Sequence, residues 1–165
     1  MAIIVEDGSG VANANSYVSV ADAKVWLTAR GLAFTSNDDT VIGTLLIKAM
    51  DLLESFRARF KGAKTSSTQS LQWPRYNVYI DNVEVDDDVI PVELVSAQVQ
   101  LAYEAQTVEL QPTGTGQEIL KEKVGPIETE YAESGSSVTR PQLTKAMTFL
   151  EPLLVNGATI RVIRA

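Results

Sequence analysis

The chain has 165 residues, of which 45% are hydrophobic and 21% are charged, and it carries a formal net charge of −7. This composition predicts one folded domain over residues 1–165 and argues against global disorder. The chain contains no cysteine and no histidine, which excludes disulfides, cysteine-ligated zinc, thiol nucleophiles and a histidine general base. No apolar run approaches the ~20 residues of a membrane span, and the first residues lack a basic leader, so we expect no membrane segment and no signal peptide.

The charge is spread unevenly along the chain. Residues 1–80 carry eight Lys/Arg and seven Asp/Glu, residues 81–133 carry thirteen acids and two lysines, and residues 134–165 carry four bases and one acid. The middle segment therefore has a balance of −11. Because binding to duplex DNA needs clustered Lys/Arg, this balance argues against such a role for the whole protein. It predicts an acidic surface that is either functional or simply solvated.

A first helix is predicted over residues 20–30. Ser19 is placed as its N-cap, with Asp22 in the capping-box position, and Gly31 ends the helix in the left-handed conformation. The inner face is assigned to Val25, Trp26 and Ala29.

A second helix is predicted over residues 40–61. Its apolar residues recur at spacings of one, three and four, as in an amphipathic helix. Asp38 or Asp39 caps its start and Gly62 stops it. Several bases near residue 60 lie where the helix dipole favours positive charge.

Five further elements are predicted after the second helix. Residues 63–90 form a long connection, and Pro91, a favourable first helical residue, leads into a third helix over residues 92–108. A β-hairpin is predicted over 118–131, a fourth helix over 141–150 and a terminal strand over 159–163. Residues 3–5 are a further strand candidate. The predicted fold is mainly α, α+β in the loose sense: a small bundle of about four helices with a β-hairpin, long loops and extended termini.

No catalytic pattern is found in the sequence. It has no nucleophile elbow, no phosphate-binding glycine loop and no dinucleotide fingerprint, so we expect no enzyme activity and no cofactor. The acidic run 81–88 does not fit a calcium-binding EF-hand, because a loop starting at Asp86 places Pro91 where a glycine is required. The run is interpreted as charge at a helix N-terminus plus a solvated loop, and no metal is expected.

Two segments carry a resemblance to a known family. They are Asn13–Ser19, which leads into the helix with Trp26, and Gln69–Arg75, which contains Leu71, Trp73 and Pro74. With Phe60, Gly62, Pro91 and the Lys123–Pro126 turn, and in this order, they resemble the head–tail connector proteins of tailed bacteriophages, also called adaptor or head-completion proteins. Some of those proteins are labelled DnaT-like single-stranded-DNA-binding proteins.

The resemblance implies a structural role in the virion. It implies a homo-oligomeric ring of twelve subunits at the head–tail interface, assembled from protein made in the bacterial host cytoplasm. The ring would contact the portal protein on one side and a tail or neck completion protein on the other. Packaged double-stranded DNA would pass through the lumen without specific binding, and acidic walls would repel its phosphates.

Two groups of residues are candidates for these contacts. The candidate subunit or portal interface contains Trp73, Arg75, Tyr76, Ile160, Val162 and Ile163, because Trp and Arg dominate interface hot spots and the apolar terminus suits docking. The alternative is a purely structural role, in which Trp73 folds back into the core and Arg75 caps a helix or pairs with an acid. The candidate lumen-facing acids are Asp86, Asp87, Asp88, Glu122, Glu128 and Glu130.

The alternative function is single-stranded-DNA binding. Such proteins combine a basic groove with aromatic side chains on which bases stack. The residues that could form a small patch of this kind are Arg57, Arg59, Lys61, Lys64, Trp73, Arg75 and Tyr76. The acidic remainder of the chain opposes this interpretation.

Overall fold

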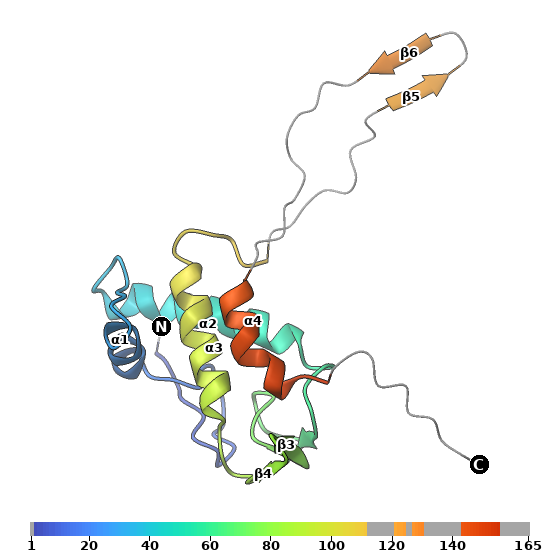
Figure 1. The fold of residues 1–165 in the computed structure, drawn as a ribbon. Coiled ribbons are helices and arrows are strands. Elements are labelled where there is room, and N and C mark those ends of the chain that lie inside the picture. The colour runs from blue at the N-terminus through green and yellow to red at the C-terminus, as the bar shows by residue number, and fades with distance from the viewer. Residues whose placement is uncertain (1, 112–120, 125–126, 131–142, 156–165) are drawn as a thin grey trace, which may run out of the picture.

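The computed structural model describes residues 2–111, 121–124, 127–130 and 143–155. Within these residues four helices pack together, and two small two-stranded antiparallel sheets lie at one end of the bundle (Figure 1). A third two-stranded sheet belongs to the stretch between the third and fourth helices. The predicted mainly α fold is therefore confirmed.

The first helix, α1 (Val20–Thr28), begins where the sequence predicts. The Ser19 side chain accepts a hydrogen bond from the backbone of Asp22 at 3.1 Å, as a capping residue should. Gly31 has a φ of 67°, which confirms the predicted left-handed end. The predicted inner face was wrong for Val25, which is 68% exposed, and for Ala29, which is also exposed. Trp26 packs against the core as predicted, and the buried residues of the helix are Ala23 and Leu27.

The second helix, α2 (Asp39–Ser55), is capped by Asp38 and ends six residues before the predicted boundary. Beyond Ser55 the chain makes a series of tight turns, in which Phe56, Arg57 and Arg59 donate to carbonyls three or fewer residues back. The turns carry Phe60 into the core, where its ring packs edge-on against Trp73 with centroids 6.0 Å apart. Burial of this aromatic pair thus outweighs the local helical pattern.

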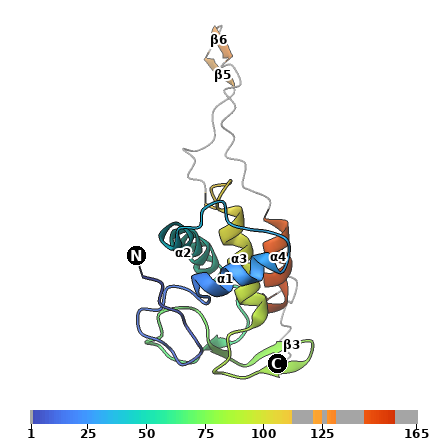
Figure 2. The ribbon, with the colours of Figure 1, turned by 90° about the vertical axis from the view of Figure 1, so that its left-hand side faces the viewer.

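The third helix, α3 (Val92–Glu104), is the central element of the bundle. It packs against α1, α2 and α4, and Figure 2 shows it between α2 and α4 with α1 crossing in front. Eight of its thirteen residues are buried, as expected for a helix covered on several sides. Pro91 is the N-cap rather than the first helical residue. The helix stops short of the predicted residue 108.

The fourth helix, α4 (Thr144–Leu150), continues into a 3-10 turn, η1 (Glu151–Leu153), that contains Pro152. The chain then forms an antiparallel bridge between Leu154 and Phe60. Because Leu150, Leu153 and Leu154 are all buried, this stretch closes the core. The predicted residues 141 and 142 of this helix lie outside the described residues.

The predicted long connection over residues 63–90 was wrong in part, since it contains four short strands. These are β1 (Ala63–Lys64), β2 (Arg75–Tyr76), β3 (Val78–Ile80) and β4 (Val83–Val85). β1 pairs with β2, and β3 pairs with β4, both antiparallel. Asp81 and Asn82 join β3 to β4 with φ values of 51° and 65°, the conformation of a two-residue hairpin turn.

The predicted hairpin near residue 125 is confirmed as β5 (Lys121–Val124) paired with β6 (Ile127–Glu130). The predicted strand over residues 3–5 is reduced to one bridge between Val5 and Ser16, and the predicted terminal strand over 159–163 lies outside the described residues. Within the part of the chain that the structure describes, no helix combines the length and the apolar character that crossing a bilayer requires.

Candidate functional site

The two segments that carry the family resemblance meet in the protein interior. The backbone N–H of Trp73 donates to the hydroxyl of Tyr17 at 3.0 Å, and both side chains are buried. Burial, together with the nearby charge of Glu54, raises the pKa of Tyr17 well above its ordinary value of 10.0. The hydroxyl therefore stays neutral and keeps its role as acceptor at physiological pH.

A buried glutamine ties the first segment to two helices. The side-chain oxygen of Gln98 accepts from the backbone of Tyr17 at 2.9 Å. Its amide nitrogen donates to the Ser16 hydroxyl at 2.9 Å and to the Leu46 carbonyl at 3.1 Å. Because Gln98 lies on α3 and is fully buried, all these polar groups need each other as partners. No local pattern in the sequence indicates this network.

Arg75 holds the second segment together. Its guanidinium donates to the carbonyls of Lys61 at 2.7 Å, Gly62 at 2.8 Å and Gln72 at 3.3 Å. Burial lowers the pKa of the Arg75 guanidinium from its ordinary value, while the nearby charge of Glu54 acts in the opposite direction. Gly62 is required here because its φ is +66° and a Cβ would collide with the carbonyl oxygen of Tyr76.

Tyr17, Trp73, Arg75 and Gln98 are called the core network from here on. The side chains of Trp73 and Arg75 are enclosed by the same molecule and do not lie on its described surface. This placement agrees with the purely structural role for Trp73. Arg75 donates to carbonyls and, within the described residues, does not pair with an acid. Their part in a subunit or portal interface stays a prediction. Tyr76, the next residue, is 44% exposed.

A small basic surface follows α2. Arg57 and Arg59 are exposed, and the ammonium of Lys61 donates to the Tyr79 carbonyl at 3.1 Å; these three residues are called the basic turn. Tyr79 is 51% exposed, and its backbone carbonyl is the group that meets the basic turn. The predicted single-stranded-DNA patch therefore loses Trp73 and Arg75 to the interior but gains Tyr79.

An open groove of about 490 Å³ adjoins the basic turn. Arg59 and Leu154 line it on one side. The other lining residues belong to α4 or adjoin it: Leu143, Thr144, Met147, Thr148 and Glu151. The lining combines apolar side chains, such as Met147, with the opposite charges of Arg59 and Glu151. Among the described residues, no group of three or more acidic side chains is placed to hold a metal ion.

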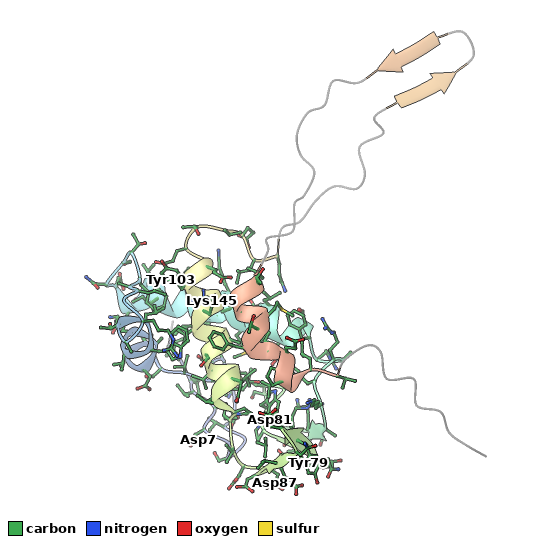
Figure 3. The ribbon with its side chains drawn as sticks, in the orientation of Figure 1. Asp7, Tyr79, Asp81, Asp87, Tyr103 and Lys145 are labelled. Atoms are coloured by element: carbon green, nitrogen blue, oxygen red, sulfur yellow. The ribbon has the colours of Figure 1, made fainter. Side chains whose placement is uncertain are left out.

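A second charged surface lies on the β3–β4 hairpin and the loop after it. Asp81, Glu84, Asp86, Asp87 and Asp88 are all exposed and are called the acidic edge. Figure 3 shows Asp81 and Asp87 toward the same end of the molecule as Asp7, away from Tyr103 and Lys145. Gly8 packs on the Asp88 carbonyl so closely that a Cβ would collide with it, which holds the N-terminal loop against this edge.

The other candidate acids lie on the β5–β6 hairpin. Lys121 pairs in register with Glu130 and Lys123 with Glu128, while Glu122 pairs with Thr129. The lumen-facing role of these acids and of Asp86 to Asp88 stays a prediction. Ile160, Val162 and Ile163 lie outside the described residues.

These features define a mainly α domain. The segments Asn13–Ser19 and Gln69–Arg75 contribute to its interior, and its exposed surfaces are charged. The whole chain, residues 1–165, matches the family model described as "Putative DnaT-like ssDNA binding protein", and the protein belongs to this family. No curated protein and no solved structure matches the chain.

Proposed function

We propose that this protein is a structural subunit of a tailed-phage virion, which forms a ring of twelve subunits between the portal and the tail. The observation that carries the proposal is the distribution of charge. Residues 81–93 contain six acids and no base, and the five acids of the acidic edge are exposed. Repeated around a ring, such a surface produces a strong negative field, which repels phosphate and lets duplex DNA pass without being held.

The core network supports the same proposal. A ring subunit must keep its shape while neighbouring molecules and DNA act on it, and buried side chains held by specific hydrogen bonds make a fold rigid and specific. The segments that resemble connector proteins are the ones that supply Tyr17, Trp73 and Arg75. The resemblance is therefore concentrated in residues that determine the shape of the subunit.

Cryo-electron microscopy of the neck of the parent particle tests this proposal. The expected result is a twelvefold ring of this chain directly below the portal, with the acidic edge on the lumen wall. A neck whose density contains no copy of this fold would reject the connector role. A ring with the acidic edge on its outer wall would reject the proposed repulsion of DNA.

A second candidate function is single-stranded-DNA binding, and the family description supports it more directly than it supports the connector. The structural feature that favours it is the basic turn beside Tyr76 and Tyr79, since exposed aromatic rings next to cations suit stacked bases and phosphates. The described surface elsewhere is dominated by acids, which opposes this candidate.

Fluorescence anisotropy with labelled oligo-dT separates the two candidates. If the basic turn binds single strands, three phosphate contacts give a slope of about −2 in a plot of log affinity against log salt. Replacing Arg57 and Arg59 by Ala would then abolish binding, whereas the control Arg30→Ala, which removes an exposed cation two residues after α1, would not. The connector proposal expects no binding even at low salt.

A further inference from the structure

The outer edge of the β3–β4 hairpin is open to a further strand. Ile80 pairs with Val83 next to the two-residue turn, and Val78 pairs with Val85. In a hairpin with a two-residue turn, the residues of each of these two pairs exchange N–H···O=C hydrogen bonds between the strands. The pair between them, Tyr79 and Glu84, does not, so the N–H and C=O of Glu84 point away from β3. Among the described residues, no hydrogen bond from outside the hairpin reaches residues 82–85.

Apolar side chains are exposed on both faces of this hairpin. Val83 is 68% exposed on one face, and Tyr79 is 51% exposed on the other. An open edge with exposed apolar residues is a template for strand addition, in which main-chain hydrogen bonds supply affinity and side chains supply specificity.

The charge of the edge indicates what kind of strand fits. The five carboxylates of the acidic edge surround β4, so a complementary strand carries bases between apolar residues. A stretch of this kind lies at residues 159–164, Thr-Ile-Arg-Val-Ile-Arg, and no acid follows Glu151. In an extended conformation Ile160 and Val162 share one face, and Arg161 lies on the other.

We propose that residues 159–164 of a second copy of this chain add as a strand to the outer edge of β4. This inference rests on the self-association contained in the proposed function and gives that association a specific subunit contact. Arg161 and Arg164 pair with carboxylates of the acidic edge, and Ile160 and Val162 cover Val83. Two of the five carboxylates are then paired with arginines, and the other three stay exposed, as the proposed lumen wall requires.

The same chain reaches this edge poorly. Val155 donates to the Arg59 carbonyl at 2.7 Å, and the adjoining η1 contacts β3. The four Cα–Cα steps from Val155 to residue 159 span at most about 14 Å when extended. Crossing β3 and β4 takes about 10 Å, two strand spacings, which leaves only about 4 Å for the required change of direction. A strand from a neighbouring copy meets no such restriction.

Cysteine cross-linking tests the contact directly, because the chain has no cysteine of its own. Two single variants, Val83→Cys and Val162→Cys, are mixed at high concentration and oxidised. The matched control replaces Val83→Cys by Val25→Cys, which alters a valine on α1 with the same exposed fraction of 68%. We expect at least about tenfold more disulfide-linked heterodimer from the Val83→Cys mixture than from the control, the ratio that a 1.4 kcal/mol preference gives.

Three outcomes are informative. Equal yields from Val83→Cys and Val25→Cys would overturn the inference. An intramolecular disulfide in the dilute double variant, without heterodimers in the mixture, would replace the second copy by the same chain and would also overturn it. Charge reversal by Asp86→Lys and Asp87→Lys is expected to lower the heterodimer yield several-fold, and an unchanged yield would contradict the proposed ion pairs. Cross-linking without a ring in the particle would instead reject the connector role alone.

Discussion

The core network and the acidic edge are built on opposite principles. In the core network, the buried side chains of Tyr17, Arg75 and Gln98 have specific hydrogen-bond partners, such as the three carbonyls that accept from Arg75. At the acidic edge, five carboxylates stand exposed beside one another with no base nearby in sequence. The hydrogen bonds of the core network define the shape of the protein. The acidic edge is a surface whose electrostatic energy falls only when a positively charged group approaches. The segments that carry the resemblance to connector proteins therefore mainly determine the architecture, and we expect the function to depend on the exposed surfaces.

The largest effect is expected for Trp73→Ala. Removing a fully buried indole that packs against Phe60 should lower the free energy of unfolding by about 3–5 kcal/mol, measured by chemical denaturation. Trp73→Phe should cost less, since the indole N–H has no partner in the described part of the chain. Equal losses in the two variants would contradict the assignment of Trp73 to the packed core.

Arg75→Ala is expected to rank second. It leaves the carbonyls of Lys61 and Gly62 without their donor and should lower the free energy of unfolding by about 2–3 kcal/mol. Arg75→Lys should restore little, because one ammonium cannot replace a forked guanidinium. The control Arg57→Ala, at an exposed position, should change stability by less than about 0.5 kcal/mol. Comparable losses at the two arginines would contradict a structural role specific to Arg75.

Tyr17→Phe tests the link between the two segments. The backbone N–H of Trp73 loses its acceptor, which should lower the free energy of unfolding by about 1–2 kcal/mol at neutral pH. The pKa of Tyr17 is raised in the folded protein, so the folded state retains this proton where the unfolded state releases it. Stability should therefore fall as pH rises above about 10.

The pH dependence has a clear control. The Tyr17→Phe variant lacks the titrating group, so its stability should fall less steeply above pH 10.0, the ordinary pKa of the residue. The difference between wild type and variant is measured by thermal unfolding across alkaline pH. Parallel curves for the two proteins would show that the Tyr17 hydroxyl is not buried in the folded state.

The smallest effect on stability is expected at the acidic edge. Asp87→Asn removes an exposed charge and should change the free energy of unfolding by less than about 0.5 kcal/mol. It should nevertheless weaken any association that depends on the acidic edge. A large loss of stability would mean that this edge, like the core network, is part of the architecture.

Local signals in the sequence located several elements correctly. Ser19 and Asp38 marked helix starts, Gly31 marked a left-handed end, and the stripe of apolar residues identified α2. The β3–β4 hairpin was missed although Asp81-Asn82 lies between alternating apolar residues, which is a recognised hairpin signal. The composition of the surrounding loop, rich in acids, concealed it.

The sequence by itself determined the helices, their caps and the excess of acids in the middle of the chain, because these follow from periodicity and from local hydrogen bonds between residues a few positions apart. Only the tertiary structure decided that α2 ends early, that Trp73 and Arg75 lie inside, and that Gln98 joins Ser16, Tyr17 and Leu46. These contacts link residues up to 82 positions apart. Their partners become adjacent only when the helices pack, and no local pattern in the chain encodes that adjacency.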